Sequence, residues 1–171
     1  MRTLSNKSTF RPIVLGAISG VCGTIAMDAL WYKRYREGGG KDDVGTWEFA
    51  SSVTGWDNAS APGKVGGKLL ALVRRRPAPD SWARPTTNLV HWLTGAGWGI
   101  QYAVLRGKVG QERWALGLLL GPSAWLSSYV VLPFLGLYKP IWEYDARTLA
   151  KDLSAHMVYG VVTAGALKGL N

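Results

Sequence analysis

The sequence predicts an all-α membrane protein, a bundle of four transmembrane helices with a long, partly helical loop between the first and the second. Three observations favour this fold class. Hydrophobic residues make up 47% of the chain, several stretches long enough to cross a bilayer carry almost no charge, and most Lys and Arg residues lie beside those stretches. A lipid bilayer selects this pattern, because a charged side chain costs little in the interface and much in the hydrocarbon.

Four segments have the length and composition of spanning helices, each about 20 largely apolar residues. They cover residues 12–32, 85–105, 114–138 and 148–170. The third is the most apolar and contains Pro122 and Pro133, which membrane helices tolerate and which usually mark kinks. The fourth is the most polar, since Lys151, Asp152 and His156 lie in its first third. We expect the fourth helix to contact protein more than lipid.

The chain is predicted to be a single domain over residues 1–171. Its first apolar segment is interpreted as a retained helix and not as a secretory signal. The apolar run continues to Leu30 with Asp28 inside it, and no small-residue cleavage site follows. Cys22 is the single cysteine and lies within this segment, so an intramolecular disulfide is excluded.

The loop of residues 33–84 is predicted to contain short helices over 44–53 and 64–76. In the second, from Lys64 to Arg76, apolar residues at helical spacing lie beside a basic cluster. This is typical of a helix in the headgroup layer that binds anionic lipid headgroups, and a solvated basic loop docked on the bundle is the alternative. Thirteen basic residues lie on the loop side of the four spans and seven on the other, which predicts both termini outside the cytoplasm.

Small residues at four-residue steps predict where the helices touch, because membrane helices associate where backbones can approach closely. The expected packing glycines are Gly16, Gly20, Gly95, Gly99, Gly117, Gly121 and Gly160. A faint repeat accompanies them. Leu-Gly followed by a second Gly four residues on occurs in the first and third spans, and a His four residues before a Gly occurs in the second and fourth. Two hairpins of one design would form a parallel repeat, and chance or shared packing requirements are the alternative.

Polar side chains within the spans are expected to gather at one depth, near the side that bears the long loop. In an up-down-up-down bundle the end of the first helix, the start of the second, the end of the third and the start of the fourth all approach that side. The expected polar cluster consists of Asp28, His91, Tyr129, Asp152, His156 and Tyr159. Ionisable groups inside a membrane are costly, so such a layer indicates a proton, ion or small-molecule pathway, or a hydrogen-bonded layer that only fixes helix packing.

Candidate metal ligands are His91 and His156, at similar depth on parallel helices. Asp152 lies one turn before His156 and can orient its imidazole. Ligation of a haem by two histidines is an alternative, although the sequence has no C-x-x-C-H motif. We expect no cofactor, and an enzyme is the least supported class, since nucleophile-elbow, P-loop, dinucleotide and zinc-protease motifs are absent from the sequence.

Nucleic acid is not an expected partner, although the net charge is +9, because the basic residues flank apolar spans. The expected partner is the lipid bilayer, and a homo-oligomer or larger membrane complex is compatible with the pattern. The sequence therefore predicts a small transporter, channel-like protein or accessory subunit. The alternative is a structural membrane protein.

Residues 89–160 carry a resemblance to a known family. The residues that carry it are His91, Trp92, Gly95, Gly99, Leu132, Pro133, Gly136, Pro140, Tyr144 and His156. This stretch resembles the uncharacterised bacterial multi-pass membrane family that includes the inner-membrane protein YagU. The resemblance implies a helical membrane fold in the inner (cell) membrane, and it implies no activity or substrate.

Overall fold

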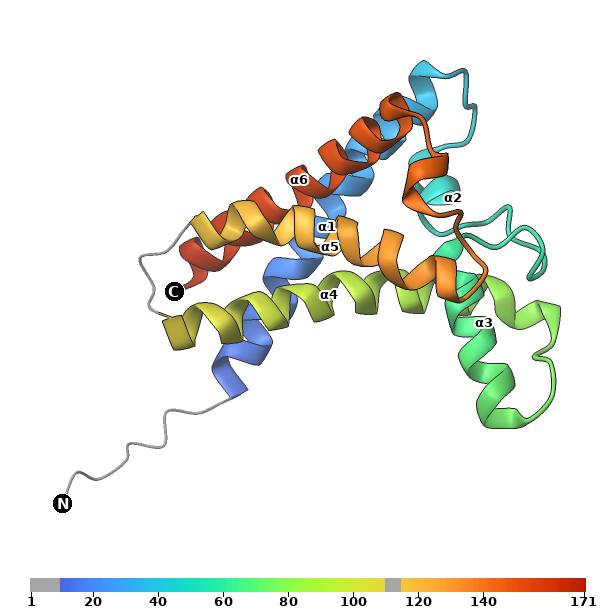
Figure 1. The fold of residues 1–171 in the computed structure, drawn as a ribbon, viewed down its shortest axis with the longest axis horizontal. Helices are drawn as coiled ribbons and strands as arrows, with labels where there is room; N and C mark the ends of the chain where they lie inside the picture. Colours follow the sequence, from blue (N-terminus) through green and yellow to red (C-terminus); the bar gives the residue numbers. More distant parts are fainter. Residues whose placement is uncertain (1–9, 110–114) are drawn as a thin grey trace.

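A computed structural model describes residues 10–109 and 115–171, and these residues form α-helices joined by loops (Figure 1). The four long helices are α1 (Phe10–Glu37), α4 (Ala83–Val109), α5 (Ala115–Phe134) and α6 (Ala146–Leu170). The shorter elements are α2 (Val44–Glu48), α3 (Ala61–Arg74) and two 3₁₀ turns, η1 (Asp80–Trp82) and η2 (Ile141–Glu143). No strand occurs in the described ranges, so the all-α prediction is confirmed.

Two of the long helices are long and apolar enough to cross a membrane. They are α1 and the Leu116–Phe134 part of α5. Among the described helices α4 and α6 do not reach the same hydropathy, since α4 contains Asn88, His91 and Gln101 and α6 contains Lys151 and Asp152. The predicted start of the third span, at residue 114, lies outside the described residues.

Helix α5 ends at Phe134, four residues before the predicted boundary at 138. Gly136 adopts a left-handed conformation with φ of 65°. This conformation lets the N–H of Leu137 donate to the carbonyl of Leu132 at 3.0 Å, and the N–H of Gly136 donate to the carbonyl of Pro133 at 2.9 Å. Together these bonds form the common glycine-terminated helix end, and they stop the helix where the apolar sequence continues.

The two loop helices also differ from their predicted bounds. The first ends at Glu48 and not at 53. The second runs over Ala61–Arg74 and not over 64–76, because Pro62 lies in its first turn, where proline is favoured, and Arg75 ends it in a left-handed conformation. Helix α3 packs against the start of α4, where a Cβ at Gly63 or Gly66 would overlap side chains of α4. This face of α3 is therefore docked on the bundle.

The four long helices form a curved row in the order α4, α1, α6, α5 (Figure 1). Helix α1 packs along both α4 and α6, and α5 packs along α6, whereas α4 and α5 make few contacts with each other. The guanidinium of Arg34 joins α1 to α6, since it donates to the carbonyl of Lys151 and to the hydroxyl of Ser154, both at 2.8 Å. The row leaves space between its two end helices, α4 and α5.

The pairs α1–α4 and α5–α6 are packed in the same way. A Cβ added to Gly20 of α1 would overlap the carbonyl oxygen of Gly95 and lie 3.0 Å from the Cα of Ala96. A Cβ added to Gly121 of α5 would overlap the carbonyl oxygen of His156 and lie 3.0 Å from the Cα of Met157. Each pair therefore brings backbone against backbone at the second glycine of the shared Leu-Gly motif.

The reverse contacts show the same correspondence. A Cβ on Gly99 would overlap the carbonyl oxygen of Gly16, and a Cβ on Gly160 would lie 3.0 Å from the carbonyl oxygen of Gly117. Gly99 thus corresponds to Gly160. The sequence repeat, a His four residues before a Gly, aligns Gly95 with Gly160. This alignment is wrong by one helical turn, because close backbone approach sets the register of these helices. In the observed register His91 corresponds to Asp152.

The interior of the bundle consists mainly of small residues around an apolar cluster of Tyr102, Ala103, Leu120, Tyr159 and Leu167. The largest side chains below 2% exposure are Thr24, Thr163 and Ser19. Large apolar side chains on all four long helices are exposed instead, among them Ile18, Ile25, Leu89, Leu93, Leu119, Leu126, Val130, Phe134 and Val161. Many large apolar side chains therefore lie on the outer surface of the bundle.

Candidate functional site

The first polar contact of the bundle joins α1 to α4. Gly16, Gly20, Thr24 and Asp28 are all buried and form one ridge of α1, which directs the Asp28 carboxylate toward α4. Its Oδ2 lies 2.7 Å from the Nε2 of His91. The Asp28 side chain is 8% exposed and that of His91 is 27% exposed, so the pair lies at the edge of the interior.

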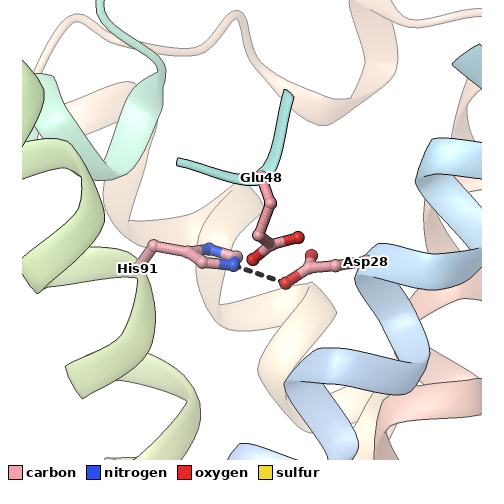
Figure 2. A group of neighbouring side chains, drawn as sticks. All are labelled: Asp28, Glu48 and His91. Carbon is pink, nitrogen blue, oxygen red and sulfur yellow. Dashed lines mark hydrogen bonds and ion pairs between the residues drawn. The ribbon is translucent and has the colours of Figure 1, made fainter. Parts of the chain in front are cut away.

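A third group, which the sequence interpretation missed, completes this contact. Glu48, the last residue of α2, directs its carboxylate toward both Asp28 and His91 (Figure 2). One ligand-type atom from each of the three residues lies within 4.8 Å of the others. Burial raises the pKa of Glu48, the negative charge of Asp28 raises it further, and His91 opposes this shift. We call Asp28, Glu48 and His91 the first polar group.

Helix α2 is fixed in place, so the position of Glu48 is well defined. Asp43 begins the helix by accepting a hydrogen bond from the backbone N–H of Thr46 at 3.0 Å. The ring of Trp47 packs against Tyr32 of α1, with ring centroids 5.4 Å apart. The carbonyl of Phe49 accepts hydrogen bonds from Arg84 and Asn88 of α4. The carboxylate is therefore held between the end of α1 and the start of α4.

The second polar contact joins α5 to α6. The hydroxyl of Tyr129 donates to Oδ2 of Asp152 at 3.0 Å. The Nδ1 of His156 lies 3.4 Å from Oδ1 of Asp152 and 3.0 Å from its backbone carbonyl. Tyr138 and Tyr144 surround the ring of Tyr129, with centroids 5.4 Å and 5.2 Å away. We call Tyr129, Asp152 and His156 the second polar group.

The two polar groups occupy corresponding places in the two helix pairs. His91 corresponds to Asp152 in the observed packing register, and Asp28 corresponds to Tyr129, since each lies eight residues after the second glycine of its motif. Tyr159 joins the pairs, because its hydroxyl donates to the carbonyl of Gly95 at 2.6 Å. The six residues predicted to form one polar cluster are therefore divided. Asp28 and His91 lie in the first polar group, Tyr129, Asp152 and His156 form the second, and Tyr159 connects the two helix pairs.

Both histidines line one cavity of about 380 Å³ between α4 and α5, which we call the α4–α5 cavity. Its lining is mainly apolar and includes Met27, Trp98, Val131 and Leu132. The polar lining residues are Thr24, His91, Thr94, Ser127, Ser128, Tyr138, Asp152, His156 and Tyr159. A second cavity of about 620 Å³ lies under the loop, is lined by all of the first polar group, and is called the loop-side cavity. His91 lines both cavities.

The two candidate metal ligands, His91 and His156, both line the α4–α5 cavity but belong to different polar groups. His91 lies with Asp28 and Glu48, whereas His156 lies with Asp152. The sequence contains only a weak indication that Glu48 belongs to the site. Glu48 is the one charged residue between Asp43 and Asp57, in a stretch that is otherwise interpreted as a helix of the loop.

Fold and site together define a helical protein with two candidate membrane-spanning helices, built from two similarly packed helix pairs that each carry an interhelical polar contact. Comparisons with protein families, with curated proteins and with solved structures give no match. Any function must therefore be inferred from the geometry of this chain.

Proposed function

We propose that the chain is a multi-pass membrane protein, placed by its resemblance in a bacterial inner membrane, that binds a small, mainly apolar molecule in the α4–α5 cavity as a carrier or as the binding subunit of one. The observation that carries the proposal is this cavity, because both corresponding polar groups contribute to its wall. Ligand pockets in proteins are commonly 300–1,000 Å³, mostly apolar, with a few polar groups that orient the ligand. The α4–α5 cavity fits that description.

The outward apolar surface supports four crossings. In α1 and α5 the most apolar windows are only 33% and 28% buried, so most of their residues are at least partly exposed. On α4, Leu89 and Leu93 are each 59% exposed. A monomer in water rarely exposes such continuous apolar surface, whereas lipid covers it at no cost. The four-helix transmembrane bundle is thus the arrangement that this surface favours.

Helix α3 provides a surface for the headgroup layer. Its glycine face docks on α4, and Leu69, Leu72 and Val73 on its other side are 58–81% exposed. Lys68, Arg75 and Arg76 are exposed beside them. Apolar side chains next to basic ones suit a helix that lies at the membrane surface against anionic lipids, and we propose this position for α3.

A topology experiment tests whether α4 crosses the membrane. With Cys22→Ser as background, Arg75→Cys places a single thiol at the end of α3, ahead of α4, and Lys108→Cys places one at the end of α4; both sites are exposed. An impermeant maleimide applied to sealed vesicles is expected to label one variant from outside and the other only after permeabilisation. Equal labelling of both from the same side would contradict the four-span proposal.

Ligand binding is tested by filling the α4–α5 cavity. Ser127 lines this cavity, so an indole ring in the Ser127→Trp variant would occupy it. Native mass spectrometry of detergent-solubilised protein is expected to show a bound small molecule on the parent and none on this variant. Leu119→Trp is the matched control, because Leu119 of the same helix is 60% exposed and lies outside the cavity. Identical spectra for all three proteins would rule out an occupied cavity.

A purely structural role for the polar groups is the second candidate. It is favoured by the hydrogen bonds of the second polar group and of Tyr159, since these groups already satisfy one another within the bundle. In that case Ser127→Trp would leave the bound mass unchanged and alter only stability. The cavity experiment therefore separates the two candidates.

A further inference from the structure

We propose that Asp28, Glu48 and His91 form a binding site for a divalent transition-metal ion of the Zn²⁺ type, a role beyond the small-molecule cavity. The three residues come from α1, α2 and α4, and their ligand-type atoms lie within 4.8 Å of one another (Figure 2). Imidazole nitrogen and carboxylate oxygen are the donors that such ions accept in three-ligand sites.

The second helix pair shows what packing alone requires. There the interhelical contact is the hydrogen bond from Tyr129 to Asp152, and His156 bonds to the carbonyl of Asp152 within the same helix. The first pair holds the equivalent contact between Asp28 and His91 and then adds the Glu48 carboxylate from the long loop. Glu48 is therefore additional to the interhelical contact that both pairs share.

The additional carboxylate is costly in its place. Glu48 Oε1 is inaccessible to solvent and finds no hydrogen-bond donor among the described residues. Its neighbour Asp28 carries the same charge, and two carboxylates held together out of water repel each other. A bound divalent cation would balance both charges while His91 ligates in its neutral form.

The geometry needs little change to accept an ion. Metal–ligand bonds of about 2.0–2.2 Å in a tetrahedral site separate the ligand atoms by roughly 3.3 Å. The 2.7 Å contact between Asp28 Oδ2 and His91 Nε2 would open slightly, and the ligand atom of Glu48 already lies within 4.8 Å of both. Water from the loop-side cavity could fill the remaining coordination position, since all three residues line that cavity.

Cationic side chains near the site do not occupy it. Arg34 and Lys151 also line the loop-side cavity. The Arg34 guanidinium is directed to α6, where the carbonyl of Lys151 and the hydroxyl of Ser154 accept its hydrogen bonds. No Lys or Arg of the described residues forms an ion pair with Asp28 or Glu48. The two carboxylates are thus available to a metal ion.

The test is Zn²⁺ titration of full-length protein without a histidine tag, purified in detergent and freed of metal by chelator. Calorimetry is expected to give one Zn²⁺ per chain, and Mg²⁺ at the same concentration is expected to give no comparable heat. Glu48→Gln is expected to weaken Zn²⁺ binding about 100-fold, because removal of even an outer-shell partner usually costs about 10–100-fold. Asp28→Asn and His91→Gln are expected to do the same.

His156→Gln is the matched control, since it removes the other histidine of the chain and leaves the proposed site intact. We expect it to bind Zn²⁺ like the parent. Glu48→Gln keeps the fold measurable, because it changes one group at the end of a short loop helix, and its unbound thermal midpoint is expected to equal that of the parent. Zn²⁺ should raise the midpoint of the parent and of His156→Gln, and leave that of Glu48→Gln unchanged. Parent-like Zn²⁺ affinity in Glu48→Gln, or no stoichiometric binding by the parent, would overturn the proposal.

Discussion

Replacing Gly20 with leucine is expected to abolish most of the folded protein. A Cβ at this position would overlap the carbonyl oxygen of Gly95, which is backbone and cannot rotate away. Relief requires α1 and α4 to separate, and this would also break the contact of Asp28 with His91. We expect a loss above about 3 kcal/mol in unfolding free energy, the upper end of the usual cost of overpacking.

The measurement is the yield of monodisperse protein in detergent together with its thermal midpoint. Gly121→Leu should be equally damaging, because its Cβ would overlap the carbonyl oxygen of His156 in the corresponding place of α5–α6. Gly165→Leu on α6 is the control, since a Cβ there meets nothing within 4 Å. If Gly20→Leu accumulates and melts like the Gly165→Leu protein, the close approach of α1 to α4 is wrong.

Replacing Tyr159 with alanine is expected to be the next most destabilising change. Its side chain is 3% exposed, packs in the apolar centre with Tyr102, Leu120 and Leu167, and donates to the carbonyl of Gly95. Truncation of a buried aromatic ring to alanine commonly costs about 3–5 kcal/mol. The loss here also removes one hydrogen bond between the two helix pairs, which the contacts of Arg34 with α6 also join.

Tyr159→Phe separates the ring from the hydroxyl. It keeps the packing and removes the 2.6 Å hydrogen bond, so we expect a loss of about 0.6 kcal/mol, as is typical between membrane helices. Reversible unfolding in mixed micelles would give both values. An alanine variant no less stable than the phenylalanine variant would show that the ring does not pack between α1, α4 and α6.

The local features of the fold follow from the sequence. Apolar runs between charged or glycine-rich stretches placed all four long helices within a few residues of their observed bounds. The four-residue spacing of Gly16, Gly20, Thr24 and Asp28 identified the buried ridge of α1, since residues four apart lie on one face of a helix. Hydropathy pattern and local periodicity are properties of a single segment, so they can be recognised in the sequence without knowledge of the tertiary structure.

Helix ends were less predictable where they depend on one residue's conformation. The apolar sequence after Phe134 continues, and the left-handed Gly136 ends α5. Likewise Pro62 and Arg75 set the bounds of α3 more strongly than its apolar spacing does. Such ends are decided by backbone hydrogen bonds, which hydropathy does not report.

The tertiary structure alone decided the register and the membership of the site. The sequence aligned His91 with His156, whereas close backbone contact at Gly99 and Gly160 aligns His91 with Asp152. It also offered no reason to bring Glu48 to Asp28, because tertiary contacts bring these residues together, among them the packing of Trp47 on α1 and the hydrogen bonds of the Phe49 carbonyl to α4. Contacts between distant segments depend on how whole helices approach each other. A ridge of glycines on one helix permits a close approach, but the residues that meet there are decided by both helices together.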